Sequence, residues 1–310
     1  MANDHYLPQF YLRAFAISGR PSSIYHYERN RQPVPKEIRS VASDDGYYKI
    51  ETKDSIVPPN TIDRIYTIVE GKAGPIIQRL IAGTDFSLSD KSKGILSNFI
   101  AFQAFRTPWA RETGKSLDLT RKRQDFKHFA ENKEKFYEFA KDFDSSLDSE
   151  EIEQRSQSML NVEEHVVVRH ATSGENESYF MAFGVVVAWR SIPTLFRKQW
   201  HLIQSVGSEL FITSDNPVVR VPPHNFHRGM RVGFDDSPVV LPISPKRALL
   251  LDNDKHHDEI VKIEDAQVVE FNRLMINLAH ESIFASVESG KIQRAFDATE
   301  SVIDGSIYLV

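Results

Sequence analysis

The chain has 310 residues, of which 41% are hydrophobic and 26% charged, and its formal net charge is −5. This size suits one large domain, or two that share an interface, and the negative charge argues against a protein that coats nucleic acid. The absence of cysteine excludes disulfides, thiolate nucleophiles and zinc sites with sulfur ligands. The first residues, MANDHYLPQF, lack the regions of a secretory signal, and no apolar run approaches the roughly 20 residues that span a bilayer. We therefore expect a cytoplasmic protein with no membrane partner.

The N-terminal part begins with HYLPQFYLRAFA, where apolar residues recur at helical spacing and predict a short helix. The runs SSIYHYER and GYYKI come next. Both are short, aromatic and β-branched, and they stand among Gly, Pro and Asp, which is typical of strands in a sheet.

Helices take over near residue 60. The run NTIDRIYTIVEGKAGPIIQRLIAG predicts a helix that Asn60 or Thr61 caps and that ends at Gly83. A second helix is predicted from about Ser89 through GILSNFIAFQAFR, and Pro108 ends or bends it.

The middle of the chain is strongly charged. Residues 113–160 contain RKR, ENKEKF and the acidic segment KDFDSSLDSEEIEQ, and we expect them to form a charged helical insertion or lobe within a single domain spanning 1–310. A further helix is predicted over 175–194, although its valine-rich run is also compatible with a strand.

Strands dominate the C-terminal part. KQWHLIQS and SELFITS predict a hairpin around Val206 and Gly207, and VVRV, VVLPIS and RALLLD predict further strands. EDAQVVEFNRLMINL has the pattern of an amphipathic helix, and SIFAS reads as a closing strand. Because strands lie near both ends with helices between them, the sequence predicts an α+β fold. We expect a mixed or antiparallel sheet formed from N- and C-terminal strands, with a large central helical part.

Two polar residues stand where the apolar strand in LFITSDNPVVRV ends. Asp215 and Asn216 follow Ser214 and precede Pro217. One interpretation is a turn, since Asp and Asn bond their own backbone and Pro cannot continue a central strand. The other is that the strand end is a rigid mount for polar groups that serve a site.

Gln103 and Arg106 lie three residues apart in NFIAFQAFRTP, so they share one face of an otherwise apolar helix. A buried guanidinium needs an anion. The anion is either an internal carboxylate, for which Asp215 is the candidate, or a substrate phosphate. The sequence leaves both open.

Three more polar residues have two interpretations each. His5 is a candidate general base or metal ligand, since histidine is the side chain whose unperturbed pKa lies near neutrality, or else it is a cap or packing residue. Glu70 lies among apolar neighbours in a predicted helix, where a solvated charge is the usual alternative. Asn272 interrupts the last predicted helix, which suggests a buried hydrogen bond.

The chain lacks the sequence motifs of several enzyme classes. The chain contains no GxGxxG, GxxxxGK[ST], HExxH or GxSxG, which disfavours ordinary nucleotide-binding folds and the α/β-hydrolases.

Four segments together resemble the DUF4238 family: HYLPQFYLRAF, FIAFQAFRTP, FITSDNPVV with the later LPISP, and the asparagine-containing last helix. They occur in the expected order over nearly the whole chain. The resemblance implies a bacterial protein of a family with members linked to defence against bacteriophage, and it brings no reaction with it. The positions that it singles out are His5, Pro8, Gln9, Arg106, Ser214, Asp215, Asn216, Pro217 and Asn272.

If the fold brings these positions together, they supply the groups that phosphoryl chemistry needs. The expected catalytic residues are a base, an anion clamp, a carboxylate and an amide donor: His5, Arg106, Asp215 and Asn216. The expected substrate-binding residues are Gln9, Gln103, Ser214 and Asn272. Glu70 would complete a metal site for Mg²⁺ or Mn²⁺.

Two functions follow as expectations. The first is an effector hydrolase in phage defence, such as a metal-dependent nuclease, that acts on nucleic acid or a nucleotide. The second is a non-catalytic protein that senses a phage product, such as a phage protein that acts as the trigger, and in which the polar cluster is a structural network.

Overall fold

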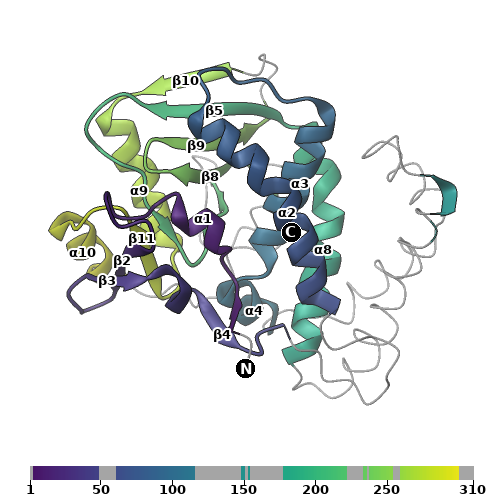
Figure 1. The fold of residues 1–310 in the computed structure, drawn as a ribbon, viewed down its shortest axis with the longest axis horizontal. Helices are drawn as coiled ribbons and strands as arrows, with labels where there is room; N and C mark the ends of the chain where they lie inside the picture. Colours follow the sequence, from purple (N-terminus) through teal and green to yellow (C-terminus); the bar gives the residue numbers. More distant parts are fainter. Residues whose placement is uncertain are drawn as a thin grey trace.

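A computed structural model of the chain describes residues 3–48, 61–115, 148–150, 153, 177–221, 233–235, 237–253 and 259–299. The charged lobe predicted for 113–160 lies almost entirely outside the described residues. The described part combines a layer of helices with two larger sheets and a two-stranded one (Figure 1), so the α+β prediction is confirmed.

Most of the helices agree with the sequence patterns, whereas those over 108–115 and 290–297 were not predicted. The helices are α1 (Gln9–Arg13), α2 (Thr61–Ala82), α3 (Asp90–Phe105), α4 (Pro108–Lys115), α8 (Glu177–Arg197), α9 (Asp265–Leu278) and α10 (Gly290–Asp297), with a 3-10 turn η1 (Ile38–Ser40). Ser89 caps α3, since its side chain accepts a hydrogen bond from the backbone N–H of Ser92. Among the residues that the structure describes, no helix is both long enough and apolar enough to cross a membrane.

The five-stranded sheet, called the larger sheet below, has the strand order β10-β5-β9-β8-β7. Its members are β5 (Gln199–Ser205), β7 (Val219–Arg220), β8 (Val239–Ser244), β9 (Arg247–Asp252) and β10 (Glu259–Ile263). All pairs are antiparallel except β10 with β5, which is parallel. The hairpin predicted around Gly207 is wrong, because β5 pairs with β9 and β10 and not with the strand that follows it.

The larger sheet is covered on both faces, and this explains why β8 has no exposed residue. Side chains such as Trp200 and Leu241 belong to the main core that α2, α3 and α8 share. Their neighbours on the other face, such as Val240, pack with Val268 of α9. In Figure 1 the helical layer and α9 accordingly lie on opposite sides of these strands.

The second sheet joins the two ends of the chain, as the sequence predicted. Its order is β3-β2-β11-β6, formed by β2 (Ser23–Glu28), β3 (Val34–Glu37), β6 (Thr213–Ser214) and β11 (Ser282–Ala285). A small separate sheet pairs β1 (Asn3–His5) with β4 (Ser43–Asp45). The run GYYKI was predicted as a strand, but Tyr47 and Tyr48 follow β4 without belonging to it.

Candidate functional site

Arg106 follows the last turn of α3 and is only 2% exposed. Its Nε and Nη2 donate to Gln103 Oε1 at 2.9 and 2.5 Å, and its Nη1 donates to Glu70 Oε1 at 2.5 Å. The guanidinium also lies 5.0 Å from the centre of the Tyr66 ring. Burial opposes the positive charge, but Tyr48 and Glu70 outweigh it and raise the pKa of Arg106 above its ordinary value. Arg106 is therefore a charged residue whose partners are internal.

The same network fastens the N-terminal segment to the helices. Gln103 Nε2 donates to the backbone oxygen of Tyr6 at 3.1 Å, and the Tyr48 hydroxyl donates to the backbone oxygen of His5 at 2.7 Å. The Tyr47 hydroxyl donates to the backbone oxygen of Arg106 at 2.9 Å. These bonds fix where the chain around His5 lies relative to α2 and α3.

A cleft of about 400 Å³ opens beside this segment. Its lining combines carboxylates, one histidine, one arginine and aromatic rings: Asp4, His5, Pro8, Gln9, Phe10, Arg13, Tyr48, Asp63, Tyr66, Thr67 and Glu70. Partial burial and then the charges of Asp4 and Glu70 raise the pKa of Asp63. The cleft is therefore acidic, and it brings together four residues that the sequence singled out: His5, Pro8, Gln9 and Glu70.

Asp215 lies elsewhere and does not form the ion pair with Arg106 that the sequence suggested. Its Oδ1 accepts from the backbone N–H of His280 at 2.8 Å. Its Oδ2 accepts from the N–H groups of Glu281 and Ser282 at 2.6 and 2.8 Å. Burial raises the pKa of Asp215 while these three bonds oppose that effect. The correction has a simple cause: β6 ends against the start of β11, so Asp215 meets the turn after α9.

The neighbouring polar residues also bond internally, and none of them lines the cleft. Asn216 Nδ2 donates to the backbone oxygen of Leu278 at 3.1 Å, and the Ser214 hydroxyl lies 3.1 Å from Met275 Sδ. Asn272 accepts from the N–H of Ile212 and donates to the carbonyl of Leu210, at 3.1 and 2.8 Å. These contacts lock α9 against the LFITSDN segment.

The comparisons with known proteins give one match. The sequence profile described as "Protein of unknown function (DUF4238)" matches residues 3–289. The chain belongs to the DUF4238 family. No curated protein and no solved structure matches it. The DUF4238 match includes both the cleft and the Asp215 network.

The metal site predicted at Glu70 has a competitor in this DUF4238 protein, because Arg106 already binds the Glu70 carboxylate. Across the described ranges, no group of three or more His, Asp or Glu side chains is arranged to hold a metal ion. A divalent cation at the cleft therefore stays a prediction.

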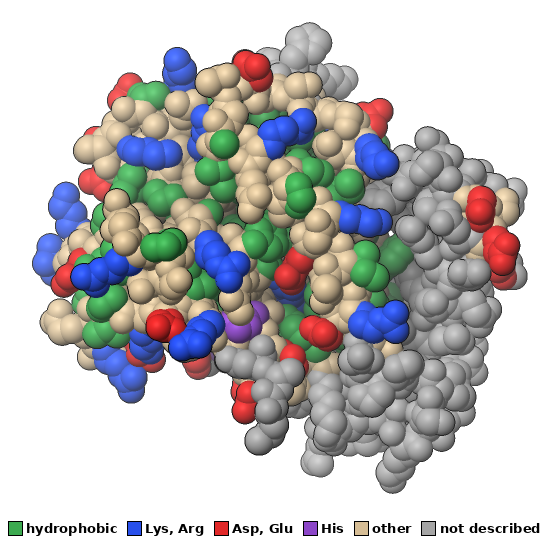
Figure 2. All heavy atoms as spheres, viewed as in Figure 1, with side chains coloured by type: hydrophobic (Ala, Val, Ile, Leu, Met, Phe, Trp, Pro, Cys, Tyr) green, Lys and Arg blue, Asp and Glu red, His purple; other side chains and the backbone are tan. Residues whose placement is uncertain are grey.

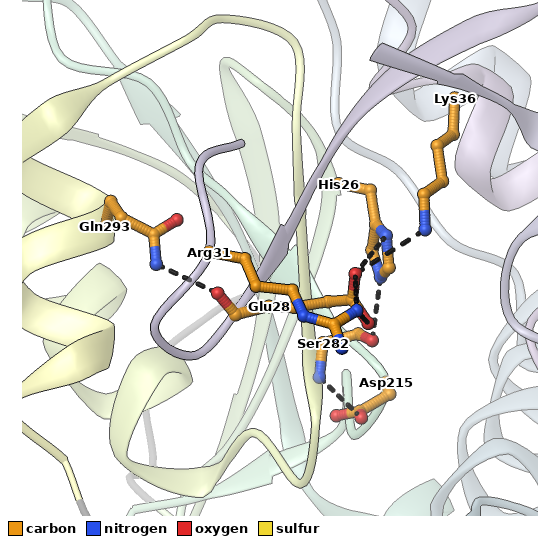
Figure 3. Close-up of polar contacts among 7 residues, drawn as sticks. All are labelled: His26, Glu28, Arg31, Lys36, Asp215, Ser282 and Gln293. Carbon is orange, nitrogen blue, oxygen red and sulfur yellow. Dashed lines mark hydrogen bonds and ion pairs between the residues drawn. The ribbon is translucent and has the colours of Figure 1, made fainter. Parts of the chain in front are cut away.

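A second polar cluster was not anticipated from the sequence. It combines His26 and Glu28 of β2 with Ser282 of β11, and Figure 3 shows it beside Asp215. The alternation in IYHYE carries part of the signal, since residues two apart on a strand share a face. Ser282 is 256 residues from His26, so only the strand pairing reveals it.

Proposed function

We propose that this DUF4238 protein is an effector hydrolase in bacterial defence against bacteriophage, and that the cleft beside His5 is its active site. The observation that carries the proposal is the lining of that cleft, where His5 and the acidic residues Asp4, Asp63 and Glu70 line about 400 Å³. A histidine and carboxylates around one space are the groups that general acid and base catalysis uses. The link to phage defence rests on the family resemblance alone.

His5 is the proposed base. Its imidazole takes a proton from the water that attacks phosphorus, the bond from phosphorus to the leaving oxygen breaks, and the leaving oxygen keeps the electron pair and takes a proton from solvent. The Arg106 guanidinium binds the Glu70 carboxylate at 2.5 Å, which fixes the position of Glu70 at the cleft. Gln103 acts as a positioning residue, because it binds both Arg106 and the backbone next to His5.

The volume and the charges of the cleft suit a nucleotide substrate better than a long nucleic acid. Its volume is at the lower end of the range for small-molecule sites, about 300–1,000 Å³. Among the described residues on the face drawn in Figure 2, acidic and basic side chains are interspersed and form no broad basic surface. The acidic lining would repel a bare phosphate, so Mg²⁺ or Mn²⁺ bound by Asp4, Asp63 or Glu70 would supply the offsetting charge.

The alternative is a non-catalytic protein that binds a phage product. The observation that favours it is the internal bonding of Arg106 and Asp215, two of the expected catalytic residues. Polar networks that are satisfied in this way rigidify a fold.

The test compares the purified protein with its His5→Ala and Asp45→Asn variants. Asp45 is an exposed carboxylate of the neighbouring strand and does not line the cleft, so its variant is the matched control. Each is incubated with nucleotides, single-stranded DNA and RNA, with Mg²⁺, Mn²⁺ or a chelator. Loss of a general base should lower the rate about 10²–10⁴-fold in His5→Ala only.

Phage challenge of cells that carry the same variants gives the second readout. The proposal expects His5→Ala to lose protection at unchanged protein abundance. Retained protection in His5→Ala would remove the cleft from the function. Tight ligand binding without turnover, together with lost protection, would favour the non-catalytic alternative.

A further inference from the structure

The pairing of β2 with β11 brings a hydroxyl, an imidazole and a carboxylate to one face of the second sheet. In the antiparallel register, Phe284 lies opposite His26 and Ser282 lies opposite Glu28. Residues two apart share a face, so all four side chains project on the same side. The ring of His26 stacks on that of Phe284, with centroids 5.3 Å apart and an interplanar angle of 16°. This contact fixes the plane of the imidazole.

The two nitrogens of His26 face different groups, as Figure 3 shows. Nε2 lies 2.9 Å from Ser282 Oγ, which is a hydrogen bond. Nδ1 is buried, has no hydrogen-bond partner within the described part of the chain, and lies 3.9 Å from Glu28 Oε2. If the hydroxyl donates to Nε2, the ring proton is on Nδ1 and faces the carboxylate.

Asp215 places the serine in this arrangement. It accepts from the backbone N–H of Ser282 and of the residue before it, at 2.8 and 2.6 Å. Its own N–H donates to the backbone oxygen of Ser282 at 3.0 Å. Three bonds from one buried residue therefore fix the main chain on which the hydroxyl is mounted, and Asp215 is a positioning residue for Ser282.

We infer that Ser282, His26 and Glu28 form an acyl-transfer site, with Ser282 as the nucleophile and a small carboxylic ester as the substrate. None of the three residues lines the His5 cleft, so this inference goes beyond the proposed function. The order of hydroxyl, imidazole and carboxylate is the one that activates a serine for attack on a carbonyl carbon.

The hydrolysis of the ester needs only these three side chains and one water. Ser282 Oγ forms a bond to the carbonyl carbon while His26 Nε2 takes its proton, and the bond from that carbon to the alcohol oxygen breaks as the imidazole returns the proton. Water then attacks the acyl-serine with the same imidazole as base, which releases the acid and restores the hydroxyl. Glu28 stabilises the imidazolium that forms in each step.

The charges around the site indicate which esters it takes. Lys36 Nζ and Arg31 Nη1 lie 3.6 and 3.3 Å from Glu28 Oε2, and their side chains are 37% and 70% exposed. They form a positively charged rim at the solvent side of the carboxylate. An ester that carries a second, anionic group is therefore favoured over a neutral one of equal size.

Burial also sets the protonation state of His26. Burial, then the charge of Lys36, lowers the pKa of His26 to about 4, with Glu28 opposing the shift and Arg31 adding to it. The imidazole is therefore neutral and able to accept a proton above about pH 5.

The experiment uses a fluorophosphonate probe, which phosphonylates activated serines, on the full-length protein from about pH 4 to pH 8. Intact mass and peptide mapping identify the modified residue. We expect one adduct at Ser282, and a rate that is constant from about pH 5 upward and falls toward pH 4. Ser282→Ala should abolish the adduct, whereas Ser18→Ala, which removes an exposed serine outside the cluster, should not.

His26→Gln tests the base, because glutamine keeps a polar group in place but cannot take the proton. The labelling rate at Ser282 should fall about 10²–10⁴-fold, as should hydrolysis of an anionic p-nitrophenyl ester. Circular dichroism shows whether each variant is folded. No adduct on the native protein at millimolar probe, adducts spread over several serines, or an unchanged rate in a folded His26→Gln would overturn the inference.

Discussion

Replacing Asp215 by alanine should destabilise the protein by about 4 kcal/mol. The carboxylate accepts from three backbone N–H groups and is 1% exposed. Each bond to a charged group contributes about 1.5–3 kcal/mol, and the alanine variant leaves the donors buried. The sum is reduced because the substitution also removes a buried charge, whose desolvation raises the pKa of Asp215. At about 2 °C per kcal/mol for a chain of this size, the melting temperature should fall by roughly 8 °C.

Asp215→Asn is the matched comparison. The amide oxygen can keep the bonds to the N–H groups of Glu281 and Ser282, while the NH₂ group faces the N–H of His280. One bond is lost and no charge is buried, so we expect a loss of about 1–2 kcal/mol. Urea and thermal denaturation give both values, and hydrogen exchange should accelerate at residues 280–282 in the alanine variant. A loss below 1 kcal/mol in Asp215→Ala, or unchanged exchange at those amides, would refute the reasoning.

Three further outcomes are expected. Arg106→Lys should lose about 3 kcal/mol, because lysine lacks the planar fork and leaves Glu70 poorly paired. Urea denaturation measures the stability of Arg106→Lys, of Glu70→Gln and of the double variant. A coupling energy between residues 106 and 70 near zero would contradict the pairing. Because the His26 pKa drops to about 4 on folding, the unfolded chain binds more protons between about pH 6.5 and 4. The free energy of unfolding should therefore fall on acidification through that window, by on the order of 3 kcal/mol, and His26→Gln should flatten the profile. Gly207→Ala should lower the melting temperature, because a Cβ there would lie 2.0 Å from Asp265 Oδ1. An Asp265→Ala background should remove that effect, and a persistent drop would show that the clash is not its cause.

Periodicity in the sequence was enough to predict most elements but not their partners. α3 and α9 were predicted because apolar residues recur at helical spacing and because residues such as Ser89 mark a start. The pairing of β5 failed, since a strand pattern says which face is buried and not which strand lies alongside. No strand was predicted for the parallel partner β10, EIVKI, although three of its residues are β-branched and only Glu259 and Lys262 are exposed.

The candidate site shows the same division between local and distant information. That Gln103 and Arg106 share a helical face followed from their spacing and is confirmed by their two hydrogen bonds. That the anion would be Glu70 and not Asp215 did not follow, because both carboxylates are distant in sequence and only packing decides between them. A helix periodicity gives the direction in which a side chain projects. The periodicity does not show which other helix or strand the side chain contacts.

The question raised by the end of the LFITS strand has an answer in this structure. The end of this strand does position a polar group, the Asp215 carboxylate, but that carboxylate binds the backbone N–H of Ser282 and not a substrate. The N-terminal segment connects this network to the cleft through Tyr6. Its backbone oxygen accepts from Gln103, while burial and then the charge of Asp215 raise the pKa of its hydroxyl. The same segment reaches β6 through Tyr11, whose hydroxyl lies 2.7 Å from Thr213 Oγ1. The segment that carries His5 is therefore held by α3 through Gln103 and by β6 through Tyr11.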